Sequence, residues 1–227
     1  MWILFAFGSA LFAGLTSILA KCGIKNTDSN AATAIRTIIV LIFSWIMVFL
    51  VGAQHSIGNV SVKTWTFLIL SGLATGASWL CYFRALQIGD VDKVVPVDKS
   101  SAILSILLAF IFLHESISPL KLLCVVLIGV GTYLMITKKG TSSENSGKKG
   151  WRWFFYALGS AVFASLTSIL GKVGIENIDS NLGTAIRTIV VLIMAWIVVF
   201  VTKKQDSVRT IDHRELGFIC LSGLATG

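Results

Sequence analysis

Two arginines in matching sequence contexts are the residues of this 227-residue chain whose type and position best suit the binding of a charged solute. Arg36 and Arg187 each lie in a TAIRTI segment within a long apolar run. A charge at membrane depth costs roughly 2.5–3.5 kcal/mol on insertion scales, and it usually marks a pathway or a buried partner. Since a guanidinium holds a carboxylate through two parallel hydrogen bonds, the pair favours an anionic or carboxylate-bearing solute. The alternative is that both side chains reach the lipid headgroups from about 9 Å inside a helix end.

A second group of candidates surrounds an interrupted apolar run. Pro96, Asp98 and Lys99 precede an uninterrupted apolar stretch that covers only residues 102–113. In membrane transporters with repeated halves, proline-interrupted segments point to the solute site. An ordinary helix start explains the same residues, because the first helical turn does not need the amide hydrogen that proline lacks. Both interpretations stay open: a helix start, or a broken helix whose freed backbone groups and charges face a wet cavity.

Aromatic and basic residues also gather near the end of the third apolar run. Trp79, Tyr82 and Arg84 lie within two helical turns of one another. Such aromatics usually form a belt at the membrane interface, and the arginine would anchor the helix on the cytoplasmic side. The alternative is that all three line a solute cavity. The candidate substrate-binding set is therefore Arg36, Arg187, Pro96, Asp98, Lys99, Trp79, Tyr82 and Arg84.

Catalysis and metal binding are not expected. The four cysteines and three histidines lack the spacing of metal ligands, and no nucleophile, base and orienting group occur together. No acid falls in the middle of an apolar run, and the nearest, Asp98 and Glu115, lie near predicted span ends. We therefore expect no enzyme, no cofactor and no proton coupling through a central carboxylate.

The composition determines which elements must position these residues. The chain is 55% hydrophobic and 13% charged, with a mean hydropathy of +0.84, whereas soluble domains carry about 25% charged residues. A bilayer core of about 30 Å needs roughly 20 helical residues, and the apolar runs have that length. We therefore predict an all-α polytopic membrane protein with spans at residues 2–20, 31–51, 65–86, 94–113, 120–137, 153–170 and 182–201, and an eighth span beginning near Leu216.

An internal repeat with an offset of 151 residues organises these spans. Of the 75 positions from Trp2 to Gly76, 42 are identical in Trp153 to Gly227, without a gap. Five spans precede the polar segment 138–150, and an odd number of crossings inserts the second copy upside down. We predict two inverted five-helix repeats: residues 1–137, a linker at 138–150, and residues 151–227, which end in the third helix of the second copy. A complete second copy would extend to about residue 288, which is Thr137 shifted by the offset, and would give ten helices in place of about seven and a half.

The distribution of Lys and Arg predicts the orientation, because short cytoplasmic connections are enriched in both. The second copy reverses the bias of the first, since Lys25 becomes Glu176 and three neutral residues become Lys203, Lys204 and Arg209. Neutral drift is the alternative explanation. We expect the N-terminus outside and the linker in the cytoplasm. The basic residues on the predicted cytoplasmic side of the first copy are Lys21, Lys25, Arg84, Lys93, Lys99, Lys138 and Lys139.

Two short repeated motifs are assigned structural roles. The segment TDSN and its copy IDSN supply N-cap candidates, of which Asp28, Ser29 and Asn30 form the first set. Gly72 and Gly76, repeated in the second copy, form a small-residue face that lets helix backbones approach closely.

One long segment resembles a known family. It contains RAL at Arg84, GD at Gly89, VVPVDKSS at Val94 and FLHES at Phe112, followed by a span with GVG. In this order the motifs resemble the EamA family of the drug/metabolite transporter superfamily, although His114 stands where relatives commonly have glycine. The resemblance implies ten helices in two inverted five-helix bundles, which move small metabolites, amino acids or drugs across a bacterial inner membrane by alternating access.

The sequence therefore predicts a secondary transporter of small polar solutes. The alternatives are a non-transporting membrane scaffold or partner subunit, and a flippase for a lipid-linked substrate. The expected partners are the solute, anionic on the arginine interpretation, and the lipid bilayer; a homodimer is compatible with the sequence. Nucleic acid is not expected, because the net charge of +8 comes from Lys and Arg at the ends of apolar runs rather than on one solvated face.

Overall fold

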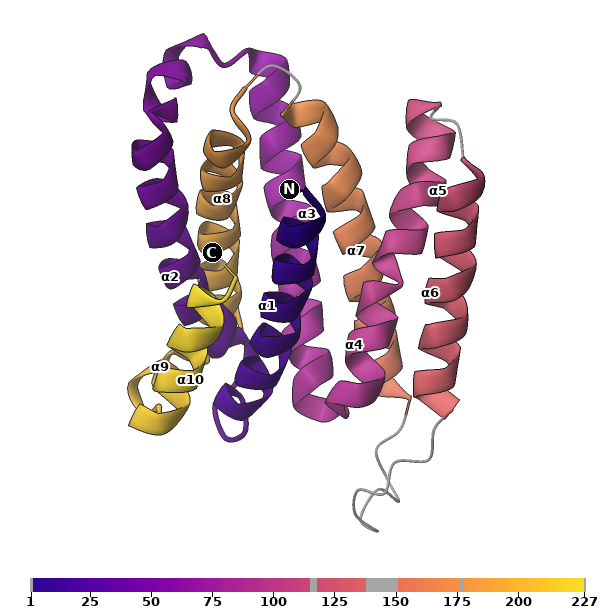
Figure 1. The fold of residues 1–227 in the computed structure, drawn as a ribbon. Helices are drawn as coiled ribbons and strands as arrows, with labels where there is room; N and C mark the ends of the chain where they lie inside the picture. Colours follow the sequence, from indigo (N-terminus) through magenta and orange to yellow (C-terminus); the bar gives the residue numbers. More distant parts are fainter. Residues whose placement is uncertain (1, 115–117, 138–150, 176–177, 227) are drawn as a thin grey trace.

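The computed structural model describes all residues except 1, 115–117, 138–150, 176–177 and 227 (Figure 1). Glu115, Glu176 and the linker therefore lie outside the described residues. The described part of the chain contains α-helices and one 3-10 segment and no strand. The elements are α1 (Trp2–Gly23), α2 (Ser29–Val51), η1 (Ala53–Asn59), α3 (Val62–Ile88), α4 (Val91–Lys99), α5 (Ser101–Leu113), α6 (Pro119–Thr137), α7 (Arg152–Gly174), α8 (Ser180–Val201), α9 (Gln205–Arg209) and α10 (His213–Leu224).

The long apolar helices confirm an all-α multi-pass membrane protein. Six candidate spans occur among the described residues, and one of them, Val91–Leu113, combines α4 and α5. α6 is not among these six spans, because its described apolar part, Pro119–Met135, is shorter. Most helices extend beyond the predicted apolar runs by about one turn. An apolar run ends at the first polar residue, whereas a helix continues through polar residues to its cap. α3, for example, begins at Val62, directly after its N-cap Ser61.

The predicted N-caps are confirmed at the aspartates. The Asp28 carboxylate accepts a hydrogen bond from the backbone N–H of Asn30, and the Asp179 carboxylate accepts from Asn181 and Leu182. Both caps have extended backbone angles, and each satisfies amide groups that the first helical turn leaves unpaired. The same cap therefore starts α2 and α8, the two helices that carry the arginines.

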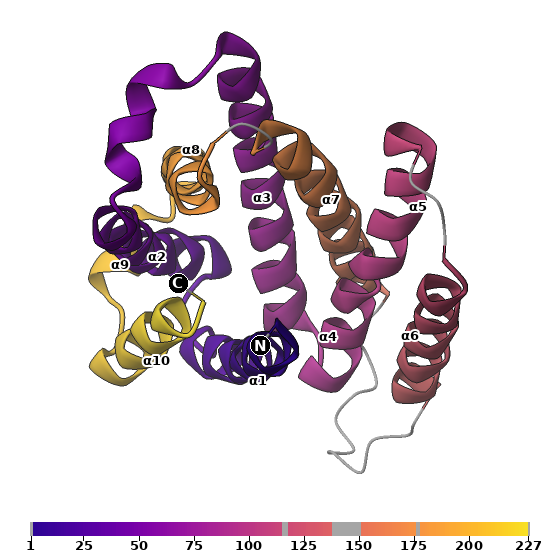
Figure 2. The ribbon, with the colours of Figure 1, turned by 45° about the horizontal axis from the view of Figure 1, so that its top comes forward.

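Helices of the two copies alternate in the bundle. α3 packs on α7 and α8, α10 packs on α1 and α2, and α2 packs on α8. α4 and α5 pack on the outer side of α7, and α6 lies beyond them at one edge (Figures 1 and 2). Figure 1 shows that α1 ends, and α7 begins, at the same end of the bundle, so these matching helices run in opposite directions.

The close contacts between the copies are reciprocal. A Cβ on Gly72 would lie 2.8 Å from Val190 Cβ, and a Cβ on Gly223 would lie 2.9 Å from Ile39 Cβ. Both residues of the second contact match those of the first through the offset of 151. Because helix association in lipid depends on backbone proximity rather than on the hydrophobic effect, these glycines set the spacing of α3 on α8 and of α10 on α2.

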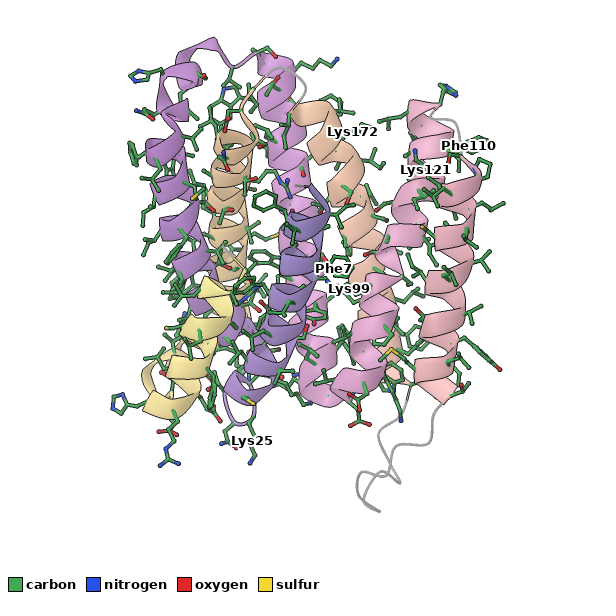
Figure 3. All side chains as sticks on the ribbon, in the orientation of Figure 1. Phe7, Lys25, Lys99, Phe110, Lys121 and Lys172 are labelled. Atoms are coloured by element: carbon green, nitrogen blue, oxygen red, sulfur yellow. The ribbon has the colours of Figure 1, made fainter. Side chains whose placement is uncertain are left out.

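The outer surface of the bundle is apolar. Phe5 of α1 and Val201 of α8 are each 76% exposed. Phe110 of α5, which Figure 3 labels, is 51% exposed. The interior combines apolar clusters with small and hydroxyl residues, such as the fully buried Ala32, Ala161 and Ser71. An apolar outer surface suits a bundle whose surroundings are lipid, and the buried hydroxyl groups can contact one another inside.

We predict that Gly72→Ala lowers the stability of the bundle by about 1–3 kcal/mol, because the added methyl group overlaps the Val190 side chain. Gly223→Ala should cost a similar amount. Thermal unfolding of the purified protein in detergent measures both. Gly14→Ala is the matched control, since nothing lies within 4 Å of its Cβ. Equal melting temperatures for Gly14→Ala and Gly72→Ala would contradict the reciprocal packing.

Candidate functional site

A cavity of about 630 Å³, lined by both polar and apolar side chains, lies among helices of both copies. Five of the eight candidate residues line it. They come from three helices: Arg36 from α2, Trp79 and Tyr82 from α3, and Asp98 and Lys99 from α4. The remaining wall consists of Ser9, Phe12, Ala13, Thr16, Ser17, Ser78, Ser101, Ala164, Leu224, Ala225 and Thr226.

Arg36 is turned into this cavity and not toward the headgroups. The residue is only 3% exposed. Its guanidinium carbon lies 4.7 Å from the Trp79 ring centroid and 5.1 Å from that of Phe83, so two aromatic faces attract the charge. Nη2 donates a hydrogen bond to Thr226 Oγ1. The headgroup alternative is therefore wrong for Arg36, because the aromatic residues of α3 and the hydroxyl group from the end of α10 hold the side chain inside.

One donor of Arg36 is left unpaired. Its Nε is buried and has no hydrogen-bond partner among the described residues. A buried donor without a partner costs roughly 1–3 kcal/mol, and the cost is larger for a charged group. An oxygen of a bound solute would remove this cost. The Nε of Arg36 is therefore a buried donor that no described residue satisfies.

Arg187 occupies the matching position in the second copy, but it is not among the residues that line the cavity. Its Nη2 donates to Thr75 Oγ1 at 3.2 Å, which repeats the contact between Arg36 and Thr226 with the copies exchanged. Its Nε is also buried without a partner among the described residues. The structure therefore gives the two arginines equivalent partners and unequal access to the cavity.

Asp98 is the anionic group of the cavity. It is 8% exposed, and its Oδ1 accepts a hydrogen bond of 2.5 Å from Ser160 Oγ of α7. Ser78 Oγ of α3 donates in turn to the Ser160 carbonyl at 3.1 Å. Lys99 Nζ lies 3.6 Å from Asp98 Oδ2, with 58% of the lysine side chain exposed. The carboxylate is therefore held on one side by the Ser160 hydroxyl and faces an exposed ammonium group on the other.

The geometry of the fourth span corrects two expectations. Pro96 is the sixth residue of α4, so the helix-start interpretation is wrong; the helix begins at Val91, because the polar turn that hydropathy assigns to a connection is helical. α4 and α5 meet at Ser100, which keeps right-handed helical angles and whose N–H donates to the Pro96 carbonyl at 3.0 Å, so the two helices are nearly continuous. Asp98 consequently lies inside the candidate span Val91–Leu113 and not at its end. Asp98 and Lys99 line the cavity, whereas the freed backbone groups of the broken-helix interpretation stay a prediction.

The aromatic group of α3 divides between two environments. Trp79 and Tyr82 are three residues apart, share one helix face and line the cavity, where the Tyr82 hydroxyl donates to Ser17 Oγ at 2.8 Å. Arg84 points elsewhere, and its Nη1 donates to Gln87 Oε1 at 2.7 Å. Trp79 and Tyr82 are therefore placed as the cavity interpretation expects, while Arg84 belongs to a hydrogen-bond network outside the cavity.

Sequence reasoning missed the hydroxyl residues of the site. Thr226 contacts Arg36 and lies 3.3 Å from Thr16 Oγ1, and Thr75 lies 3.3 Å from Thr167 Oγ1 in the same way. All four hydroxyls recur through the offset of 151, within apolar runs. Repetition of hydroxyl residues inside both copies was the signal that could have identified them.

The arrangement can bind a solute but offers no group of metal ligands. Among the described residues, no group of three or more His, Cys, Asp or Glu side chains could hold a metal ion. The cavity instead combines a guanidinium with an open donor, a carboxylate, an ammonium group, hydroxyls and an aromatic wall. These groups match a small polar solute that carries at least one negative charge.

Comparison with known proteins agrees with this geometry. A family model described as "EamA-like transporter family" matches residues 1–137. A curated protein of Sinorhizobium sp, described as an uncharacterized transporter in the cobO 3' region, is 41% identical over 134 residues. That match covers 59% of this chain and 95% of the relative. Both similarities therefore concern a membrane transporter.

We predict that Ser160→Ala destabilises the protein by about 1–3 kcal/mol, because the buried Asp98 carboxylate loses its short hydrogen bond. Thermal unfolding in detergent measures the loss. The matched control is Ser168→Ala on the same helix, whose hydroxyl is exposed and bonds only to the carbonyl of Ala164. In an Asp98→Asn background, Ser160→Ala should lower the stability of the protein by less. An unchanged loss of stability would show that it does not come from the hydrogen bond to Asp98.

Proposed function

The chain belongs to the EamA-like transporter family, and on that premise we propose that it is a secondary transporter of small polar solutes that carry a carboxylate or a similar anionic group. Amino acids, other small metabolites and drugs of this size fall in that class. The proposal places transport in a bacterial inner membrane and makes Arg36 the anion-binding residue. Its mechanism is alternating access, in which the cavity opens to one side of the membrane at a time.

The observation that carries the proposal is the buried guanidinium of Arg36. Its charge stands in the cavity with aromatic faces against it and with one donor unpaired. A scaffold would gain nothing from such a group, since an unpaired buried donor costs stability. A transporter recovers the cost when the solute binds.

The size and the second charge of the cavity support a small solute. A volume of about 630 Å³ lies within the range of roughly 300–1,000 Å³ that small-molecule sites occupy. Asp98 and Lys99 supply an acceptor and a donor on the wall formed by α4. Trp79 offers a flat apolar surface for the uncharged part of the solute.

The two copies support alternating access as inverted repeats. α1 and α7 run in opposite directions, and Lys172 in the last turn of α7 lies near the opposite end of the bundle from Lys25 (Figure 3). Each arginine donates a hydrogen bond to a threonine of the other copy, Arg36 to Thr226 and Arg187 to Thr75. We place residues 1–137 and 151–227 in two such repeats, with Arg187 taking the position of Arg36 when the copies exchange conformations.

We predict that Arg36→Gln lowers solute transport at least about 100-fold, because a neutral amide cannot make a charge-assisted bidentate pair. Arg36→Lys, which keeps the charge but not the fork, should lose less. Counterflow in proteoliposomes, with a panel of radiolabelled amino acids and dicarboxylates, measures the rates. Arg214→Gln is the matched control, since it removes an exposed arginine of α10. Arg36→Gln at the parent rate would refute the proposed role.

The proposed orientation has the N-terminus outside and residues 138–150 in the cytoplasm. The α1–α2 connection, the end of α6 and the start of α7 lie at one end of the bundle (Figure 1). Lys204 Nζ lies 3.8 Å from Asp28 Oδ2, so the connection after α8 is at that end as well. This end therefore gathers Lys25, Lys203 and Lys204, as expected for a cytoplasmic face.

We predict that a green fluorescent protein fused at Ser143 is fluorescent and that alkaline phosphatase fused there is inactive, because the first folds only in the cytoplasm and the second only outside it. The control is the same pair of fusions at Gly58, in the connection between α2 and α3, where the two outcomes should be reversed. An active phosphatase at Ser143 would overturn the orientation.

A further inference from the structure

Glu215 connects the two copies at the end of the bundle that holds the α1–α2 connection. It lies in the first turn of α10 and is 7% exposed. Its Oε1 accepts hydrogen bonds from Asn26 N at 3.0 Å and from Asn26 Nδ2 at 2.9 Å. Its Oε2 accepts from Thr27 N at 2.9 Å and from Thr27 Oγ1 at 2.6 Å. Two consecutive residues of the α1–α2 connection thus bind one carboxylate through four hydrogen bonds.

The same connection is tied to the end of α3. Gln87 Nε2 donates to the Thr27 carbonyl at 3.0 Å. Lys21 Nζ donates to the Leu86 carbonyl and, at 2.7 Å, to the Gly89 carbonyl. We call the contacts of Glu215 with Asn26 and Thr27 the latch, because they join α10 to a connection that already holds α1, α2 and α3.

An apolar layer separates the latch from the solute cavity. Its residues are buried and in mutual contact. A Cβ on Gly23 would lie 2.7 Å from Ile219 Cγ1, so α1 and α10 approach closely at this level. The layer consists of Ala20, Ile24, Phe83, Leu86 and Ile219.

Two segments pass from cavity to layer to latch in the same order, and α3 passes from cavity to layer. Along α1 and the connection after it, the cavity residues end at Ser17, the layer includes Ala20, and the latch begins at Asn26. Along α3 the cavity residues end at Tyr82 and the layer follows. From the turn after α10 back to the start of this helix, Thr226 is in the cavity, Ile219 is in the layer and Glu215 is in the latch. The cavity is therefore closed at the latch end by two successive barriers, one apolar and one hydrogen-bonded.

The latch has no equivalent in the other copy. Through the offset of 151, Glu215 matches Thr64, and Thr27 matches Ile178, which has no hydroxyl group. The Thr64 hydroxyl accepts instead from Ser61 Oγ at 3.0 Å, within the start of its own helix. The carboxylate contact of Glu215 is therefore not repeated at Thr64 through the offset, even though the arginine contacts are reciprocal.

From this geometry we infer that Glu215 is the closing group of the gate at the α1–α2 end, and that release of Asn26 and Thr27 from its carboxylate opens the cavity to that side. The inference rests on the proposed transport function. It adds a polar lock to the apolar layer, since the state closed at the latch end gains four charge-assisted hydrogen bonds to Glu215.

Accessibility of a cavity cysteine tests the latch without any solute. Ala13→Cys places a thiol in the cavity of a full-length chain whose four native cysteines are replaced by alanine. A membrane-impermeant maleimide is applied to vesicles of each orientation, and Lys25→Cys in the same background identifies the side that faces the latch. In the parent the Ala13→Cys thiol should react from the opposite side only.

Glu215→Gln should raise the labelling rate from the latch side at least about tenfold, because an amide cannot accept all four bonds. Thr27→Val removes one donor and should raise this labelling rate less than Glu215→Gln does. The double variant should label only slightly faster than Glu215→Gln alone. Asp212→Asn is the matched control: it removes a charge three residues earlier, on a side chain that caps no backbone group.

Three results would overturn the inference: equal labelling of the parent from both sides, an unchanged rate in Glu215→Gln, or an equal rise in Asp212→Asn. Labelling from the opposite side confirms that each variant is inserted and folded. Failure of the transport test with Arg36→Gln leaves this assay unaffected, because the assay measures access and not solute. Failure of the latch likewise leaves the solute-binding role of Arg36 in place.

Discussion

The interaction on which the rest of the structure depends is the placement of a guanidinium inside an apolar helical bundle. Arg36 is held there by the faces of Trp79 and Phe83 and by the hydroxyl of Thr226. A charge at this depth is tolerated only when protein groups replace its water. Helices of both copies must therefore meet around it, and the glycine contacts of α10 on α2 allow them to meet closely enough.

Duplication supplied most of these groups in pairs, and divergence between the copies made them unequal. The arginines keep reciprocal threonine partners, yet only Arg36 lines the cavity. Glu215 and Thr27 are departures from the repeat, and both contribute to one carboxylate contact. Residues that both copies share thus build the bundle, while Glu215 and Thr27, which the repeat does not share, distinguish its latch end.

Much of the fold could be predicted because its signals are local. Apolar runs of bilayer length identify the spans, and an aspartate before such a run identifies the cap of α2. The exact helix ends could not be predicted in this way, since polar turns such as the start of α4 are helical. For the same reason Asp98 was assigned to a span end, although it lies within a candidate span and faces the cavity.

The sequence by itself determined the class of protein, the duplicated unit and the residues with the right chemistry, because composition, periodicity and repetition are properties of the chain. Only the tertiary structure decided which of those residues meet. Arg36 and Thr226 are 190 positions apart, and Glu215 and Thr27 are 188 positions apart. Contacts at such separations depend on how helices cross, which is set by packing at a few small residues such as Gly23 and Gly223. No local pattern contains that information, so the cavity and the latch emerge only when the helices are assembled.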